Sequence, residues 1–175
     1  MRQRLLFWVL LSFAMTALAG PLEDGLKAYH DGQYPQAIQL LTPLAKQNNS
    51  RAQFVLGMMS YHGQGVPEDE KAAVEWLGKA AATGYVEAMY ALGNLYLVGH
   101  EAAKLSAEPD HEAAIWYYKA AAAGHAQAQY QLGLLFLAGQ GVIRDDDIAM
   151  LWFKKAAAQG HVEAQRSLEV MRKGK

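Results

Sequence analysis

The chain has 175 residues, of which 52% are hydrophobic, and its formal net charge at neutral pH is −1. This length and composition suit one compact domain with a hydrophobic core. The near-neutral balance offers no basic stripe of the kind that nucleic-acid-binding proteins carry, and no run of like charges forms an acidic or basic tail, so a nucleic-acid partner is not expected.

Residues 1–19 have the layout of a secretory signal peptide. Arg2 and Arg4 form a short positive region, residues 5–16 are predominantly apolar, and residues 17–19 read ALA, the small-x-small pattern that signal peptidase cleaves. A membrane anchor is the competing interpretation, but a span needs roughly 20 apolar residues and this run is shorter. We therefore expect cleavage between Ala19 and Gly20, no span in the mature form, and a periplasmic or secreted location.

The chain contains no cysteine. An exported form would therefore have no disulfide framework and no lipid anchor on a cysteine after the apolar run. Packing alone is expected to hold the fold together.

Residues 20–50 are predicted to form a divergent helical hairpin. Gly25, Gly32, Tyr34 and Ala37 mark it as a hairpin of the same kind as the later units, and Leu41 and Leu44 are spaced to share its apolar core face.

Three copies of one unit follow. The dipeptide Leu-Gly recurs at Gly57, Gly93 and Gly133, at intervals of 36 and 40 residues, and a tryptophan recurs with intervals of 40 and 36. The unit is therefore 36 residues long, and the middle copy carries four extra residues between Gly93 and Trp116. The copies span residues 51–86, 87–126 (with the insertion) and 127–162.

The first half of each unit is predicted to be a helix. In the second copy, Ala88, Leu92 and Tyr96 lie four residues apart and so share one helix face. A glycine inside a helix costs roughly 1 kcal/mol relative to alanine. Matched glycines at 57, 93 and 133 therefore predict that another backbone passes too close for a Cβ.

The second half of each unit is predicted to be a turn followed by a second helix. The turn GQGV occurs at residues 63–66 and 139–142, and Asp69 or Asp145 then caps the second helix. Each second helix contains a tryptophan to fill the gap between hairpins and a lysine in its last turn, where the helix dipole favours a cation. The helices are expected to end at left-handed glycines: Gly84, Gly124 and Gly160.

Residues 163–175 begin another first helix and read as a C-terminal capping helix with a basic end. No stretch of the chain has the alternating pattern of a β-strand. The sequence thus predicts an all-α fold.

The chain closely resembles the Sel-one-like repeat family in the recurring order A-x-x-x-L-G, G-x-G-V, D, then W-x-x-K-A-A-x-x-G. That family is related to the tetratricopeptide repeats, and residues 20–50 resemble a tetratricopeptide repeat more than a Sel-one-like repeat. The resemblance covers nearly the whole chain after residue 19. It implies an α-solenoid of stacked antiparallel helix hairpins that forms a right-handed superhelix, with first helices lining a concave face. The middle copy departs from the pattern, because residues 99–110 replace GQGV.

No catalytic, cofactor or metal site is predicted. His125 and His161 occupy the same repeat position as Tyr85, which indicates a flat ring with a packing role rather than a ligand. The GQG turns follow helices and precede acidic residues, unlike phosphate loops. Residues 145–147 are interpreted as a cap and solvated first-turn charges. No nucleophile motif occurs.

The first helices carry the candidate binding residues. In tetratricopeptide-type arrays, the positions two, six and nine residues after the leading alanine tend to face the groove, and such a surface could hold a peptide. The alternative is that these residues form core between neighbouring hairpins. The nine candidates are Phe54, Met58, Tyr61, Tyr90, Asn94, Leu97, Tyr130, Leu134 and Leu137. The insertion in the middle copy is a second candidate surface.

The sequence therefore favours an exported, non-enzymatic adaptor or scaffold that binds a protein or peptide on its concave helical surface. The alternative is a protein that binds or hydrolyses β-lactams or cell-wall fragments, by analogy with a cysteine-rich branch of the family. The absence of cysteine weakens that analogy.

Overall fold

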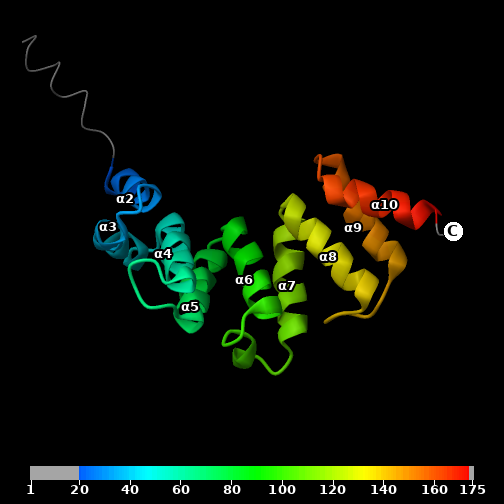
Figure 1. Ribbon diagram of the computed structural model, residues 1–175, viewed down its shortest axis with the longest axis horizontal. Helices are drawn as coiled ribbons and strands as arrows, with labels where there is room; N and C mark the ends of the chain where they lie inside the picture. Colours follow the sequence, from blue (N-terminus) through cyan, green and yellow to red (C-terminus); the bar gives the residue numbers. More distant parts are fainter. Residues whose placement is uncertain (1–19, 174–175) are drawn as a thin grey trace, which may run out of the picture.

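The computed structural model describes residues 20–173, so the predicted signal peptide lies outside the described residues. Within them the chain forms nine α-helices and one short 3₁₀ helix, with no strand, as expected for an all-α fold (Figure 1). The α-helices are α2 (Pro21–His30), α3 (Tyr34–Lys46), α4 (Ser50–His62), α5 (Glu70–Ala82), α6 (Val86–Val98), α7 (Pro109–Ala122), α8 (Ala126–Ala138), α9 (Asp146–Ala158) and α10 (Val162–Lys173). The 3₁₀ helix η1 (Ala103–Leu105) lies in the insertion.

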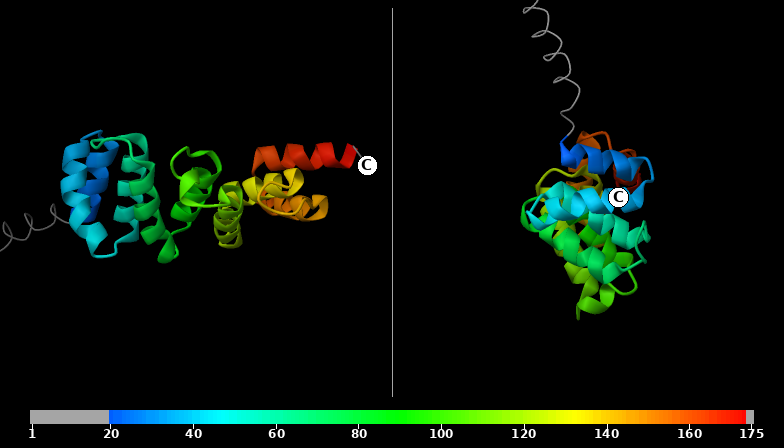
Figure 2. Two further views of the ribbon diagram at one scale, coloured as in Figure 1. Left: turned by 90° about the horizontal axis from the view of Figure 1, so that it is seen from below. Right: turned by 90° about the vertical axis from the view of Figure 1, so that its left-hand side faces the viewer.

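Consecutive helices pair as antiparallel hairpins, and the hairpins stack along one axis (Figures 1 and 2). The hairpins are α2–α3, α4–α5, α6–α7 and α8–α9, while α10 packs against α9 as one more first helix. Nearly all helix contacts join neighbours in the chain order, which is the quasi-one-dimensional organisation of an α-solenoid. The predicted α-solenoid is confirmed.

A large side chain from each second helix fills the space beside the glycine of its own first helix. A Cβ built on Gly133 would lie 2.6 Å from the ring of Phe153, and one built on Gly93 would lie 2.5 Å from the ring of Tyr117. Gly57 faces Leu77 in the same way. The expectation of a close backbone holds in part: backbone atoms would lie 3.3 Å from a Cβ on Gly57 and 3.2 Å from one on Gly133. The shortest contacts, however, are with the side chain that follows each tryptophan.

The predicted caps and turns are present. The side chains of Asp69 and Asp145 accept hydrogen bonds from the backbone N–H groups of Ala72 (2.9 Å) and Ile148 (2.8 Å). The glycines that end the second helices have φ angles of 91° at Gly84, 97° at Gly124 and 85° at Gly160, in the left-handed region. These confirmed details fix where each second helix starts and stops.

The tryptophans of the second helices face the preceding hairpin, as the sequence predicts. Trp76 packs against the core of the α2–α4 region, and Trp152 packs against the core formed by α7 and α8. The repeated lysine lies over the ring of its tryptophan, with Lys119 Nζ 3.9 Å from the ring centroid of Trp116. The same contact recurs in the other two copies, so the lysine makes a cation–π interaction as well as complementing the helix dipole.

Candidate protein-binding surface

The nine candidate residues are all half-buried, so each contributes both to the exposed face of its helix and to the packing between hairpins. Tyr90 packs against the core formed by α7 and α8, and Tyr130 packs against the core formed around α9 and α10. We use the name first-helix surface for the face formed by α4, α6, α8 and α10.

The aromatic residue two positions after the leading alanine pairs with the ring that starts the next first helix. Tyr90 stacks on His125, with ring centroids 4.6 Å apart, and Tyr130 stacks on His161 at the same distance. Phe54 meets Tyr85 at 5.3 Å. The positions that both histidines share with a tyrosine therefore have a packing role, as expected.

Both histidines also cap their helices. His125 Nδ1 accepts a hydrogen bond from the backbone N–H of Ala128 at 3.1 Å, and His161 Nδ1 accepts one from Ala164 at 3.3 Å. Desolvation lowers the pKa of His125, an effect that Glu87 partly opposes. The neutral ring is the form that can accept this bond.

Asn94, a candidate binding residue, holds a buried side chain in place. It accepts a hydrogen bond of 2.6 Å from the hydroxyl of Tyr117, which is almost fully buried. Burial raises the pKa of that hydroxyl. Asn94 thus stabilises the ring that fills the space beside Gly93.

Two adjoining hollows bring four of the candidates together. The first, of about 490 Å³, lies between α6 and α8 and is lined by Leu97, Leu134 and Leu137, with Gln131 and Ala138. The second, of about 300 Å³, lies between α8 and α10 and is lined by Tyr130 and Leu137, with several α10 residues. Because Leu137 lines both, we name them the paired hollows.

The other five candidates line neither hollow. Phe54, Met58 and Tyr61 lie on α4, where they pack against the core formed by α5 and α6. Tyr90 and Asn94 point into the contacts with His125 and Tyr117 described above.

Sequence reasoning missed the contribution of α10 to the second hollow. Arg166 and Val170 occupy the positions two and six residues after Ala164, the alanine equivalent to Ala128, and both line the hollow. Applying the same spacing to Ala164 would have predicted both residues from the sequence. Glu169 stands at the position equivalent to Gly133, so α10 has a charged side chain where the other first helices have a glycine that faces a large apolar side chain.

The insertion of the middle copy is tied to the preceding hairpin through Glu70. Its carboxylate accepts hydrogen bonds from three successive backbone N–H groups, those of His100 (3.2 Å), Glu101 (2.7 Å) and Ala102 (2.8 Å). Desolvation opposes ionisation of Glu70, but these donors outweigh it and lower its pKa. Ala102 is fully buried. The insertion is thus a packed segment of the array.

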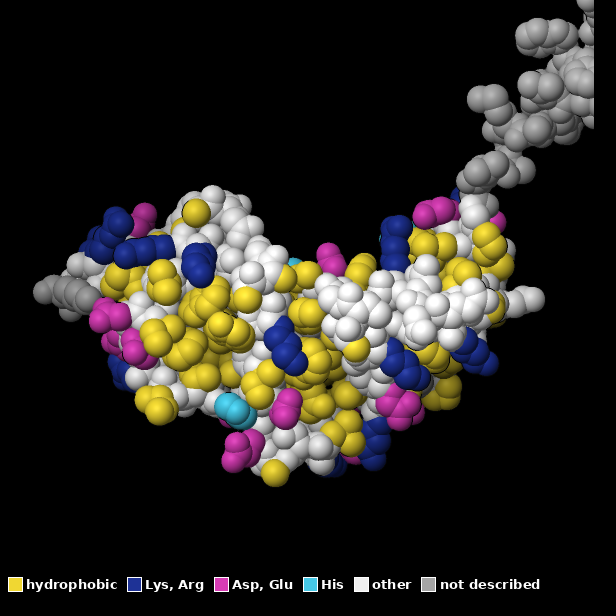
Figure 3. All heavy atoms as spheres, turned by 180° about the vertical axis from the view of Figure 1, so that it is seen from behind, with side chains coloured by type: hydrophobic (Ala, Val, Ile, Leu, Met, Phe, Trp, Pro, Cys, Tyr) yellow, Lys and Arg dark blue, Asp and Glu magenta, His cyan; other side chains and the backbone are white. Residues whose placement is uncertain are grey.

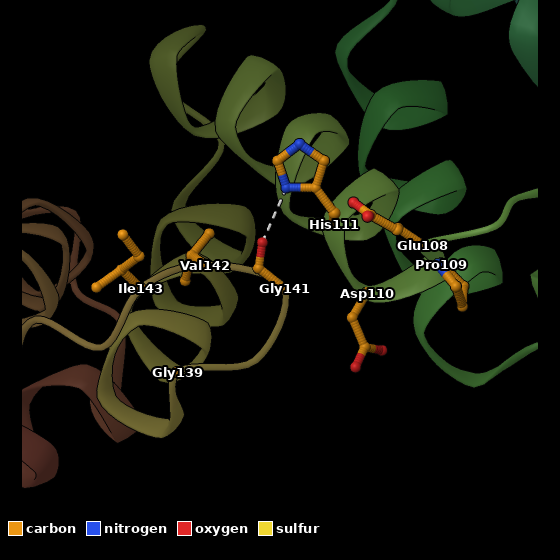
Figure 4. A pocket seen from close by; sticks show the side chains of 8 residues that line it. All are labelled: Glu108, Pro109, Asp110, His111, Gly139, Gly141, Val142 and Ile143. Carbon is orange, nitrogen blue, oxygen red and sulfur yellow. Dashed lines mark hydrogen bonds between the residues drawn. The ribbon is translucent and has the colours of Figure 1, made fainter.

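A third hollow, of about 560 Å³, lies where the loop after α8 meets the start of α7 (Figure 4). The His111 ring points toward the carbonyl of Gly141 and donates a hydrogen bond of 2.9 Å from Nδ1, whereas the carboxylate of Asp110 points away from it. A Cβ on Gly141, whose φ is 67°, would collide with the backbone of Asp110. The second GQG sequence is therefore a tight turn that docks on the preceding second helix.

Residues 20–173 present no group of three or more His, Asp or Glu side chains placed to bind a metal ion. Over the same residues, no helix has the length and apolar character required to cross a bilayer. What this surface offers chemically is apolar, partly aromatic contact area.

The model of the Sel1 repeat family matches this chain four times, at residues 12–49, 50–85, 86–125 and 126–161. The first match includes the α2–α3 hairpin, for which the sequence suggested a closer likeness to a tetratricopeptide repeat. Among curated proteins, Protein SHC1 of Saccharomyces cerevisiae (strain YJM789) is 37% identical over 87 residues, which cover 46% of this chain and 17% of that protein.

Two solved structures share the fold. The Sel1 repeat protein from Oxalobacter formigenes superimposes with a TM-score of 0.67 at 35% identity, over 78% of this chain and 38% of that one. Cysteine-rich protein B of Helicobacter pylori superimposes with a TM-score of 0.56 at 23% identity, over 83% of this chain and 96% of that one. This chain therefore covers only a minor part of the yeast and Oxalobacter proteins. With four matched repeats across most of its length, the chain belongs to the Sel1 repeat family, whose repeats generally mediate protein–protein interactions.

Proposed function

We propose that this chain is an exported, non-enzymatic interaction module that binds an extended or helical segment of another protein in the paired hollows. The observation that carries the proposal is that Leu97, Leu134, Leu137 and Tyr130, from two separate repeats, meet around adjoining apolar hollows. An array of rigid hairpins presents them already in position, which lowers the entropic cost of binding.

The partner is expected to insert apolar side chains. The α6–α8 hollow is walled mainly by leucine and alanine, with Gln131 and Gln140 as its polar residues. Burying a leucine-sized side chain contributes about 1.5 to 3 kcal/mol. Two or three such anchors contribute about 3 to 9 kcal/mol, which is comparable to the cost of association, so a stable complex also needs further apolar contacts or hydrogen bonds.

Panning a random peptide library against the purified chain from residue 20 tests this proposal. We expect peptides with two or three spaced apolar residues. Ala138→Trp should weaken their binding about tenfold, because the new ring occupies the α6–α8 hollow without removing any existing side chain. Ala138 is exposed and lines that hollow.

The matched control is Ala122→Trp. Ala122 is also an exposed residue at the end of a helix, α7, and lines neither of the paired hollows. Peptides that bind wild type and both tryptophan variants equally would refute binding at the paired hollows.

Export is the second part of the proposal, and the signal-peptide layout of residues 1–19 supports it. Expression in a Gram-negative host should give a protein that begins at Gly20 in the periplasmic fraction. Mass spectrometry of the intact protein measures this, and a cytosolic product that retains residues 1–19 would contradict it.

A further inference from the structure

A second apolar surface lies on the second helices of the last two units. Tyr118 on α7 and Leu151 on α9 are 56% and 50% exposed, and Tyr118 meets the ring of Trp152 edge-on at 6.0 Å. Tyr118 also lines a hollow of about 330 Å³, together with Ile115 and Phe136. Seen from behind, hydrophobic side chains gather over the C-terminal half of the array, where α7 to α9 lie (Figure 3).

This surface is not required by the stacking of hairpins, because its residues change between copies. The position of Ile115 is occupied by Glu75 in the preceding copy and by Leu151 in the following one, and that of Tyr118 by Gly78 and Lys154. Residues that serve stacking, such as the tryptophan, the lysine and the alanines, recur instead. An exposed apolar patch without a stacking role indicates an interaction site.

The exposed face of α9 carries an acidic residue before, and a lysine after, a central leucine, so two antiparallel copies of this face would pair opposite charges. Asp147, Leu151 and Lys154 lie four and three residues apart, so they share one helix face, and all three are exposed. Along the helix axis the acid lies about 6 Å before Leu151 and the lysine about 4.5 Å after it. Leu151 is therefore nearly the midpoint between opposite charges.

A two-fold axis through Leu151 would place α9 antiparallel to α9 of another molecule. In that arrangement the two leucines meet at the centre, and each Asp147 faces Lys154 of the other molecule. Tyr118 contacts Trp152, the neighbour of Leu151 in the chain, and its exposed ring would add apolar area on both sides. Such an interface uses the same patch twice, as isologous dimers do.

We propose that a second copy of this chain covers the patch, forming a symmetric dimer in which α9 packs antiparallel against α9. This surface is separate from the paired hollows, so its test is independent of the proposed function. The charge pattern of α9 selects a second copy over an unrelated apolar partner.

Sedimentation and light scattering of the chain from residue 20 over a concentration series measure the mass directly. We expect a monomer–dimer equilibrium. Leu151→Lys should raise the dissociation constant at least about tenfold, since it places two cations at the centre of the interface. The control is Val98→Lys, because Val98 is 71% exposed on α6 and lies outside the patch.

A charge exchange distinguishes an intermolecular pair from a general effect of charge. Lys154→Asp and Asp147→Lys should each weaken the dimer several-fold, and the double variant should restore it. Residues seven apart on one helix are separated by about 10.5 Å along its axis, so this recovery cannot come from a new ion pair within α9. Circular dichroism checks that each variant remains folded.

Because the chain has no cysteine, one engineered thiol gives a second readout. Leu151→Cys should form a disulfide-linked dimer under mild oxidation, and Val98→Cys should not. A monomeric mass at every concentration up to about 1 mM would overturn the proposal. So would a dimer that survives Leu151→Lys, or one that Val98→Lys disrupts equally.

Discussion

The ring of Phe153 occupies the space that a side chain at residue 133 would need. A Cβ on Gly133 would lie 2.6 Å from Phe153 Cε1 and 3.2 Å from the carbonyl oxygen of Ala149. The glycine therefore gives up helix propensity so that a fully buried ring can pack against the backbone of α8.

Gly133→Ala should lower the free energy of unfolding by about 1 to 3 kcal/mol, as expected for overpacking a filled core. Urea unfolding measures the change. Gly78→Ala is the control, because Gly78 also lies inside a helix, α5, but a Cβ there would meet no other atom within 4 Å. That substitution should leave stability unchanged or raise it by up to about 1 kcal/mol. Equal losses in both variants would mean that the contact with Phe153 does not set the cost.

Acidification should weaken the chain through His125. Desolvation lowers the pKa of its folded form below the value near 6.5 of the unfolded chain. The unfolded state therefore takes up the proton first, so the stabilisation is complete above pH 6.5 and is lost as the pH falls below it. The protonated ring can no longer accept the hydrogen bond from Ala128.

His125→Asn tests this, because asparagine is a good N-cap that does not titrate. Unfolding free energies at about pH 7.5 and about pH 5 should differ less for the variant than for wild type. Identical pH dependence in the two proteins would exclude His125 as a contributor. The other five histidines are present in both proteins and so cancel in the comparison.

Loss of the Glu70 carboxylate should release the insertion. Glu70→Gln replaces an acceptor of three backbone hydrogen bonds with a neutral amide and should cost about 1 kcal/mol, a value reduced for the partial solvent exposure of this site. Because the pKa of Glu70 is lowered in the folded state, this contribution is present at neutral pH and is lost as the pH falls through that lowered pKa.

Hydrogen exchange at residues 100–102 measures the release. Glu70→Gln should increase exchange there, whereas Glu75→Gln, at an exposed position of the same helix, should not. Unchanged protection in Glu70→Gln would show that burial of Ala102 alone holds the insertion.

Thr83→Gln should stabilise the chain by about 0.5 to 1 kcal/mol. The buried Gln53 donates from Nε2 to the carbonyl of Ala45, but its Oε1 has no hydrogen-bond partner within the described residues. In the last unit the equivalent Gln129 has its Oε1 satisfied by Gln159, at 2.8 Å. Residue 83 occupies the position of Gln159 in the α4–α5 hairpin.

The reciprocal change Gln159→Thr should lower stability by a similar amount, since it leaves Gln129 Oε1 unpaired. Thermal unfolding of both variants measures the effects. If Thr83→Gln lowers the melting temperature, the two hairpins do not share this geometry.

Much of the fold could be predicted because the same capping and helix-ending residues recur at the same positions of successive units. The second helices start at Asp69 and Asp145 and end before left-handed glycines such as Gly124, and each of these assignments rests on short-range chemistry that recurs in register. What excludes a Cβ at Gly93 could not be predicted, because Tyr117 lies 24 residues away and only the packing of the two helices brings them together.

The candidate site was less predictable for the same reason. The register of the first helices indicated Leu134 and Leu137, and both line a hollow. It equally indicated Phe54 and Tyr90, whose rings instead pair with Tyr85 and His125 of the following unit. Whether a ring at such a position faces a groove or its neighbour depends on which side chain starts the next helix.

Site-specific photo-cross-linking in cells that express the full chain tests the first-helix surface most directly. A photoreactive residue at Gln131, which lines the α6–α8 hollow, should give an adduct of discrete mass, and Ala138→Trp should suppress it. The same residue at Glu75, exposed on α5, should give none. No adduct from position 131, or equal adducts from both positions, would contradict the proposal that the paired hollows bind the partner.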